Sequence, residues 1–346
     1  MAAFIFRRVL TVALVGAVLP KVKAAAWCEE LGFRYSTYPG DFIQENPAIN
    51  ANPPDYTKVE YGLINRRYPT DTQSDQTQLT KWERYTKYIN YINRYYKDEN
   101  TSYKLFYFSR HGEAYHNVAQ SYYGTKCWDC YWSQQDGNGT MTWRDAELTP
   151  KGVGQLVESN QFWAETAPKA KVPFPQSFYV GPMSRTLATA NLTFGSLVDG
   201  FAPIVKENLR ETINQCTCSY RHPKSWIQAR YPKYKFEQGF TEQDEIFTGK
   251  TLESASGQSA RVRNFLDDIF AADKSTFISV VTHGVNVGPL LEVIGHQNPK
   301  FNLTTGQSIA VLVKAERFVL NGTSTVPEPP TPAESCGICG PAGSSL

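Results

Sequence analysis

Two short motifs each place a histidine directly after a run of apolar residues. Arg110-His111-Gly112 follows the run 105–109 (LFYFS), and His283-Gly284 follows the run 277–282 (FISVVT). Runs of this length, rich in aromatic and β-branched residues, predict buried β-strands. In an open parallel sheet, ligands bind beyond the carboxyl ends of the strands. We therefore expect both histidines at one edge of such a sheet.

Two arginines are expected at the same edge. Arg110 adjoins His111, and Arg185 follows a third predicted strand over 177–181. A guanidinium group can bind two phosphate oxygens at once, and a neutral imidazole near a bound phosphate can act as a nucleophile. A single histidine at a strand end is more often a packing or capping residue. Two histidines and two arginines at corresponding strand ends instead predict a site for a tetrahedral dianion.

The elements that must position these residues alternate between strand and helix. Beyond the three strands above, the sequence predicts short strands over 202–206 and 307–314. Helices are predicted from Pro150 to about Trp163, from near Ser184, around 262–270 and over 285–294. Thr149 followed by Pro150 is a typical helix start. This alternation predicts an α/β fold, a three-layer α/β/α sandwich with a mostly parallel central sheet.

Outside this region the sequence suggests three further segments. Residues 1–26 have a basic start, an apolar stretch over 9–19 and small residues before position 27, as in a signal peptide. An 11-residue apolar stretch is too short for a membrane anchor. Residues 27–103 are expected to form an N-terminal extension, irregular to about residue 75, whose amphipathic helix over 77–96 packs on the core. The catalytic domain then covers 104–320, and 321–346 is expected to be a flexible Pro/Gly/Ser-rich tail.

The leader over 1–26 is either this signal peptide or a disordered or mitochondrial leader. The secretory interpretation agrees with five N-x-[ST] sequons, at Asn100, Asn138, Asn191, Asn302 and Asn321. It also agrees with seven cysteines, all beyond residue 26, since an oxidising compartment would pair six of them. We therefore expect a secreted glycoprotein with disulfide bonds.

Three pairs of cysteines lie close together in the sequence. Cys216 and Cys218 are two residues apart, and on an extended backbone we expect each to bridge to another cysteine. Cys127 and Cys130 lie in an aromatic segment that is either a lid over the site stapled by a disulfide or a simple hydrophobic cap. Together with Cys336 and Cys339 they could alternatively form a zinc site.

The overall charge excludes some classes of partner. The chain has 346 residues with 35 Lys+Arg and 33 Asp+Glu, and only 20% of its residues are charged. This composition gives no basic surface for nucleic acid or for an anionic membrane. With 41% hydrophobic residues the chain is also not disordered as a whole.

Four blocks around the two histidines and Arg185 resemble a known family. Residues 108–117 (FSRHGEAYHN) resemble the R-H-G signature of the histidine phosphatase superfamily, also called phosphoglycerate mutase-like. Residues 145–155, 182–190 and 281–284 resemble its later blocks in the same order and spacing. Further short stretches resemble fungal phosphomutase-like proteins, at 123–126, 209–212, 223–226 and 239–245. The superfamily resemblance covers residues 104–315.

The resemblance implies a role for each site residue. His111 would be the nucleophile that becomes phosphorylated, while Arg110, Arg185 and His283 would bind the phosphoryl oxygens. Asn117 would add a hydrogen bond to the phosphate. Glu211 falls where the family often keeps its general acid, a role that needs a carboxyl group kept protonated by burial near other acids; otherwise it is a surface carboxylate. Arg221 either meets a second anionic group of the substrate or is a surface charge.

These roles imply a phosphomonoesterase that hydrolyses a small phosphorylated metabolite through a phosphohistidine, with no metal and no cofactor. The alternatives are a phosphoglycerate mutase-type phosphotransferase, a tailoring phosphatase of a fungal biosynthetic pathway, and a catalytically inactive secreted binding protein. R-H-G-E-A-Y departs from the R-H-G-x-R-x-P of the acid phosphatase and phytase branch, so a phytase is not expected. The sequence leaves the oligomeric state open.

Overall fold

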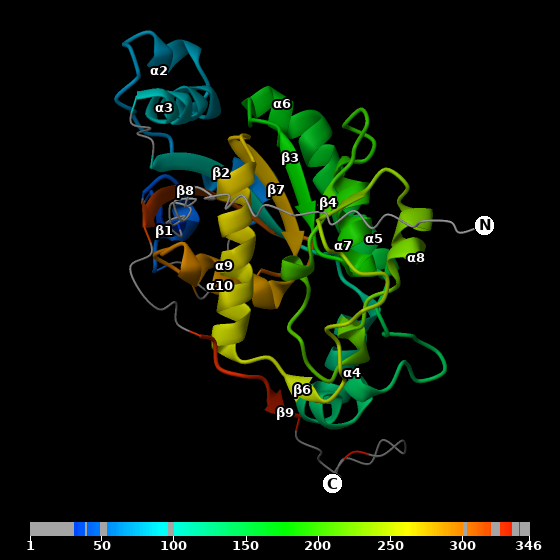
Figure 1. Ribbon diagram of the computed structural model, residues 1–346. Helices are drawn as coiled ribbons and strands as arrows, with labels where there is room; N and C mark the ends of the chain where they lie inside the picture. Colours follow the sequence, from blue (N-terminus) through cyan, green and yellow to red (C-terminus); the bar gives the residue numbers. More distant parts are fainter. Residues whose placement is uncertain are drawn as a thin grey trace, which may run out of the picture.

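Seven strands form one twisted central sheet in the order β1-β8-β2-β7-β3-β4-β5 (Figure 1). Strands β2, β7, β3, β4 and β5 run parallel, whereas β8 is antiparallel to both β1 and β2. The strands are β1 (Leu31–Thr37), β2 (Thr101–Arg110), β3 (Ser177–Val180), β4 (Ile204–Val205), β5 (Lys235–Phe236), β7 (Phe277–Thr282) and β8 (Ser308–Val319). The prediction of a mostly parallel sheet is confirmed.

The computed structural model describes residues 31–38, 40–48, 54–95, 100–299, 303–319, 326–333 and 339. The predicted leader over 1–26 lies outside these residues, as do the sequons at Asn302 and Asn321 and the cysteines Cys28 and Cys336. The longer helices are α3 (Lys81–Tyr95), α4 (Tyr115–Cys130), α5 (Pro150–Gln161), α7 (Ser184–Phe194), α9 (Ala255–Ala272) and α10 (Gly284–Val293). The shorter ones are α1 (Tyr56–Val59), α2 (Asp75–Gln78), α6 (Ala167–Ala170) and α8 (Lys224–Arg230). None of the helices in the described ranges is long and apolar enough to cross a lipid bilayer.

Helices cover both faces of the sheet. Along β2, the side chains of Leu105 and Tyr107 belong to one hydrophobic cluster, and those of Phe106 and Phe108 to another. The first cluster joins the sheet to α3, α7 and the turn that follows α5, and the second joins it to α9 and α10 (Figure 1). Successive side chains of a strand point to opposite faces, so β2 is buried from both sides. The predicted three-layer α/β/α arrangement is confirmed.

The N-terminal extension contributes directly to this architecture. Within the predicted helical range, α3 buries Trp82, Tyr85 and Ile89 in the first cluster. The expectation of an irregular stretch from residue 27 was wrong for Leu31–Thr37, which forms β1 and pairs with β8 along seven residues. The alternation of buried Phe33 and Tyr35 with exposed neighbours is the strand signal that the sequence carried there.

Described residues of the C-terminal tail, which the sequence predicts to be flexible, contact the body of the protein. Residues Thr331–Pro332 form β9, which pairs with β6 (Thr251–Leu252), and the Ser254 hydroxyl donates to the Glu328 carbonyl. Cys339 forms a disulfide bond with Cys127 in α4. The amino-acid composition could not predict these two attachments. A high content of Pro and Gly indicates that a segment is not helical, but it does not indicate whether the segment contacts the rest of the protein.

A close approach of two backbones joins the R-H-G loop to α5. A Cβ atom on Gly112 would lie 2.8 Å from the Gly152 carbonyl oxygen. A Cβ atom on Gly152 would lie only 2.0 Å from the Glu113 carbonyl oxygen. The hydroxyl of Thr149, the N-cap residue of α5, accepts from the Gly152 N–H at 3.1 Å and holds this first turn in place. Glycine is required at both positions because no side chain fits between the segments.

This contact predicts opposite effects for two glycines of α5. Gly152→Ala should lower the free energy of unfolding by about 1–3 kcal/mol, because its methyl group forces the R-H-G loop away. Gly154→Ala should raise it by about 0.5–1 kcal/mol, since a Cβ atom there meets nothing within 4 Å and alanine favours the helix. Urea denaturation of both variants tests this. Equal stabilities of the two would contradict the close packing.

Candidate active site

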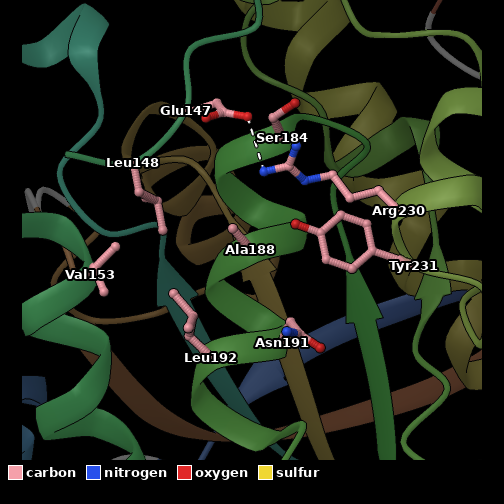
Figure 2. A pocket seen from close by; sticks show the side chains of 9 residues that line it. All are labelled: Glu147, Leu148, Val153, Ser184, Ala188, Asn191, Leu192, Arg230 and Tyr231. Atoms are coloured by element: carbon pink, nitrogen blue, oxygen red, sulfur yellow. Dashed lines mark ion pairs between the residues drawn. The ribbon is translucent and has the colours of Figure 1, made fainter. Parts of the chain in front are cut away.

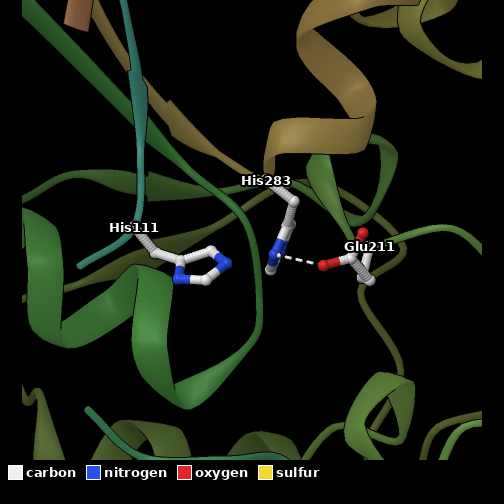
Figure 3. A group of neighbouring side chains, drawn as sticks. All are labelled: His111, Glu211 and His283. Atoms are coloured by element: carbon white, nitrogen blue, oxygen red, sulfur yellow. Dashed lines mark ion pairs between the residues drawn. The ribbon is translucent and has the colours of Figure 1, made fainter. Parts of the chain in front are cut away.

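The structure brings the two histidines together at the carboxyl ends of neighbouring strands. Arg110 at the end of β2 is paired with Thr282 at the end of β7, so the next residue of each strand reaches the same place. The ring centroids of His111 and His283 lie 5.1 Å apart, and both side chains are buried (Figure 3). The third strand of this edge, β3, leads into α7, which carries Arg185 as its second residue.

His111 is held as a neutral imidazole with one defined tautomer. Its Nδ1 lies 2.7 Å from the carbonyl oxygen of Gly112. A carbonyl oxygen only accepts, so Nδ1 carries the proton and donates it there. Burial, and then the positive charge of Arg185, hold the pKa of His111 well below its usual range. The second ring nitrogen, Nε2, therefore has a free lone pair.

The two arginines have donors left over for an anion. Arg185 is fully buried and donates from Nη1 to the Cys218 carbonyl oxygen at 2.9 Å, and Arg110 donates from Nη1 to the Leu303 carbonyl oxygen at 2.6 Å. The Nε atoms of both side chains are buried and have no partner among the described residues. Buried donors without a partner are costly, so this arrangement favours an anionic ligand.

Glu211 lies in the site, but the expectation that nearby acids keep its carboxyl group protonated was wrong. Its Oε2 atom is 3.1 Å from Nδ1 of His283 (Figure 3) and 3.3 Å from Nη2 of Arg185. Its neighbours are therefore cationic or potentially cationic groups rather than other acids. Although burial alone would raise the pKa of Glu211, His283 and Arg185 bring it well below its usual range. In the free site Glu211 is an ionised carboxylate that balances the charge of Arg185.

The loop carrying Glu211 is fixed by hydrogen bonds from side chains of β7, α9 and α10. Thr282 donates from its hydroxyl to the Leu209 carbonyl oxygen at 2.9 Å. Asn286 donates from Nδ2 to the Arg210 carbonyl oxygen at 2.6 Å, and Arg261 donates to the same oxygen at 3.0 Å. Thr282 directly precedes His283, and Asn286 lies in the first turn of the helix that follows it. The elements that position His283 therefore also position the carboxylate of Glu211.

The start of α7 is tied to the first and second sequence blocks. The Thr189 hydroxyl accepts from the Gly112 N–H at 3.1 Å and donates to the Arg185 carbonyl oxygen at 2.7 Å. Asp145, buried, accepts from the Ser184 N–H at 2.8 Å. Sequence reasoning gave neither Thr189 nor Asp145 a role, although both belong to the matched blocks. Together they fix the position of Arg185 relative to the R-H-G loop.

Asn117 and His116 stand in the first turn of α4. The Oδ1 atom of Asn117 accepts a hydrogen bond from the Ala114 N–H, and its Nδ2 atom lies 3.1 Å from Nε2 of His116. The expected phosphate hydrogen bond of Asn117 therefore competes with a contact inside the helix. His116 was quoted in the R-H-G signature without a role, yet its ring centroid lies 5.5 Å from that of His111. Its position five residues after His111, near the start of the following helix, is the signal that the sequence offered.

Arg221 lies in neither of the two expected environments. It is 1% exposed, and its guanidinium donates to Glu207 and to the carbonyl oxygens of Thr241 and Gln243. These contacts use its donors within the protein. Arg221 is thus a structural residue and not a ligand for a second anionic group.

The predicted aromatic segment forms a cap with its own small core. Trp143 packs against both Trp128 and Trp132, and Cys216 and Cys218 belong to the same cluster. Cys216 and Cys218 are bonded to each other, contrary to expectation, because a 3₁₀ turn (Thr217–Ser219) brings their Cα atoms to 5.0 Å.

The disulfide expected to staple the predicted lid joins it instead to the C-terminal tail. It runs from Cys127 to Cys339, and Cys130 is also disulfide-bonded. The same bonds exclude the alternative zinc site, since a disulfide-bonded sulfur has no thiolate to offer a metal ion.

Three groups of the site could in principle also bind a metal ion. Ligand atoms of His111, Glu211 and His283 all lie within 4.8 Å of one another. However, Arg185 contacts the same carboxylate oxygen as His283, and Arg110 lies close by. Two guanidinium groups repel a cation and attract an anion, so the charges of this cluster favour a phosphate group over a metal.

A separate pocket of about 390 Å³ lies beside the site and does not include the histidines. It lies between α5, α7 and α8, with an apolar wall and an ion pair of 3.1 Å between Glu147 and Arg230 at one side (Figure 2). Its lining residues are Glu147, Leu148, Val153, Ser184, Ala188, Asn191, Leu192, Arg230 and Tyr231.

Comparisons with known proteins identify the family of the chain. Residues 130–318 match the model of the histidine phosphatase superfamily (branch 1), a range that includes Arg185, Glu211 and His283. The chain is 42% identical over 287 residues to "Probable phosphoglycerate mutase" of Arthroderma benhamiae, covering 82% of this chain and 84% of that protein. It is 39% identical over 216 residues to "Phosphomutase-like protein 3" of Candida albicans, covering 62% and 67%.

Among solved structures, phosphoglycerate mutase from Thermus thermophilus matches with a TM-score of 0.31 and 19% identity, over 60% of this chain and 91% of that one. The family match spans more than half of this chain, and the Arthroderma relative is similar over most of its length. The chain belongs to the histidine phosphatase superfamily, whose members are phosphatases and mutases acting on small phosphorylated substrates.

Proposed function

We propose that this protein is a phosphomonoesterase that hydrolyses a small phosphorylated metabolite through a phosphohistidine at His111, without a metal ion or a cofactor. The observation that carries the proposal is the state of His111. Its Nδ1 proton is held by the Gly112 carbonyl oxygen, which leaves Nε2 as a neutral nucleophile near the buried guanidinium group of Arg185 and the partly buried one of Arg110.

The first step transfers the phosphoryl group to His111. Nε2 forms a bond to phosphorus while the bond between phosphorus and the ester oxygen breaks. The Nε atoms of Arg110 and Arg185, which have no partner among the described residues, donate to the phosphoryl oxygens as negative charge spreads over them. His283, buried at the same edge, lines the phosphoryl position from the β7 side.

Glu211 supplies the proton for the leaving oxygen. In the free site it is ionised because it faces Arg185. A phosphate dianion bound by Arg185 neutralises that cation and adds a nearby negative charge, and both effects raise the pKa of Glu211. The carboxyl group thus takes up a proton when substrate binds and gives it to the departing alcohol. In the second step a water molecule forms a bond to phosphorus while the bond between phosphorus and Nε2 of His111 breaks. Glu211 accepts the proton of that water, free phosphate leaves and the neutral imidazole is restored.

Hydrolysis is favoured over transfer to a second phosphorylated acid. A mutase needs cationic groups to hold the additional anionic group of its substrate. Arg221, considered for that purpose, is committed to Glu207 and to backbone carbonyl oxygens. The mutase names of the relatives above nevertheless make phosphotransfer the reaction to compare with hydrolysis in any assay.

We also propose that the protein acts in the secretory pathway. The disulfide bonds Cys127–Cys339 and Cys216–Cys218 require oxidising conditions to persist. Two of the sequon asparagines, Asn100 and Asn191, are exposed and accessible to glycosylation. Secretion into the medium of a fungal host, followed by mass spectrometry of the purified protein, tests this proposal; a product retained in the cytosol with free thiols would contradict it.

Two variants of His111 should test the nucleophile. His111→Ala and His111→Asn should each lower the rate of phosphate release by at least roughly 10³-fold, because neither has Nε2. The asparagine amide can still donate to the Gly112 carbonyl oxygen, so His111→Asn should also keep the melting temperature of the wild type. Phosphate release from aryl phosphates is the measurement. Substantial activity in a folded variant would contradict a nucleophilic His111.

Glu211→Gln should affect substrates according to their leaving group. An alkyl phosphate leaves as a strongly basic alkoxide and should lose roughly 10²–10⁴-fold in kcat, whereas 4-nitrophenyl phosphate should lose less than about tenfold. Comparing kcat for the two esters measures the need for a proton donor. An equal loss with both would show that Glu211 acts only in binding or in structure.

Two glycines of α10 should separate effects on Arg110 from effects on the helix. A Cβ atom on Gly284 would lie 3.0 Å from Cζ of Arg110, so Gly284→Ala should displace the guanidinium group and raise the inhibition constant for inorganic phosphate about tenfold. In Gly288→Ala the nearest atom is the Pro299 carbonyl oxygen at 3.7 Å, an ordinary contact, and inhibition should not change. Equal inhibition constants would contradict phosphate binding by Arg110.

A further inference from the structure

His116 is a buried titratable residue of the site that the proposed reaction does not use. Its side chain lies in the first turn of α4 and is 6% exposed. Its ring centroid is 5.5 Å from that of His111. Its Nδ1 atom is buried and has no partner among the residues that the structure describes. An unpartnered buried nitrogen is costly, which points to a ligand that supplies the missing hydrogen bond.

The contacts of Asn117 define which nitrogen of His116 carries the proton. Asn117 accepts from the Ala114 N–H through Oδ1, at 3.0 Å, and this fixes the orientation of its amide. Its Nδ2 therefore donates to Nε2 of His116, at 3.1 Å. Nε2 acts as an acceptor, so the single proton of a neutral imidazole lies on Nδ1. Burial, and then the charge of Arg185, keep the pKa of His116 well below its usual range, in agreement with a neutral ring.

The surroundings of His116 are the phosphate-binding groups themselves. The charges that act on its imidazole belong to Arg185, Glu211, His283 and Arg110. We propose that the Nδ1–H group of His116 donates a hydrogen bond to a non-bridging oxygen of the phosphoryl group that His111 attacks. The transfer to His111 rests on the proposed function, whereas the binding of phosphate by His116 does not depend on it.

His116 acts in this role as a neutral donor and keeps its proton throughout. No bond to it forms or breaks, and its proton does not leave Nδ1. Its proximity to His111 favours a non-bridging oxygen over the leaving oxygen, because an in-line reaction places the leaving oxygen on the side of phosphorus away from the nucleophile. His116 is then the donor next to the nucleophile, and Arg110 and Arg185 supply charged donors to the same group.

Two variants separate the hydrogen bond from the packing of the ring. His116→Phe keeps an aromatic ring but has no donor. His116→Asn has an amide nitrogen attached to Cγ, as Nδ1 is in histidine, and keeps a donor there. Binding of inorganic phosphate, measured by titration calorimetry, should weaken roughly 10- to 100-fold in His116→Phe. It should weaken less than about threefold in His116→Asn. Equal affinities of His116→Phe and the wild type, or equal losses in both variants, would overturn the proposal.

A measurement on the wild type covers the case in which a variant fails to fold. Nitrogen-15 NMR of the imidazole groups should show His116 protonated at Nδ1, and its Nδ1–H resonance should shift when inorganic phosphate saturates the site. A proton on Nε2 instead, or an unshifted Nδ1–H resonance, would overturn the assignment. A wild type that binds phosphate but hydrolyses no ester would contradict the proposed function. The binding and NMR measurements would still show whether His116 donates to phosphate.

Discussion

The buried positive charge of Arg185 is the constraint on which the rest of the site depends. A guanidinium group without solvent must be paired and hydrogen-bonded. Glu211 pairs with it at 3.3 Å, and the Cys218 carbonyl oxygen accepts from it at 2.9 Å. One carboxylate oxygen is then shared between Arg185 and His283, while the imidazole of His111 stays neutral in the same field. The Nε atoms of Arg110 and Arg185 still have no partner among the described residues, and a phosphate dianion supplies acceptors for both.

Arg185 and His111 keep their positions because distant chain segments meet around them. The Thr189 hydroxyl bonds both the Gly112 N–H and the Arg185 carbonyl oxygen, and the missing side chain of Gly152 lets α5 approach the R-H-G loop. On the opposite side, Thr282 and Asn286 hold the loop of Glu211. Nucleophile, phosphate ligands and carboxylate are therefore positioned by hydrogen bonds from side chains to the backbone and by one close approach of two backbone segments.

The sequence predicted the positions that depend on periodicity and missed those that depend on contacts. His111 and His283 were placed correctly because buried strands leave a clear pattern and parallel strands share an edge. β1 was missed because a seven-residue edge strand in a segment rich in Pro and Asn gives a short signal. The Cys216–Cys218 bond was missed because its geometry depends on a local 3₁₀ turn. The ionisation of Glu211 could not be predicted either, since its pKa depends on neighbours from other segments of the chain.

The central claim is that a neutral His111 attacks phosphorus through Nε2 because the Gly112 carbonyl oxygen occupies Nδ1. The most direct test is NMR with phosphorus-31 and nitrogen-15 labels on enzyme denatured in base during turnover of an aryl phosphate, with the phosphorylated peptide identified by mass spectrometry. The account predicts phosphohistidine at residue 111 with the P–N bond at Nε2. Phosphorus on Nδ1, on another residue, or on no residue at all during active turnover would contradict it.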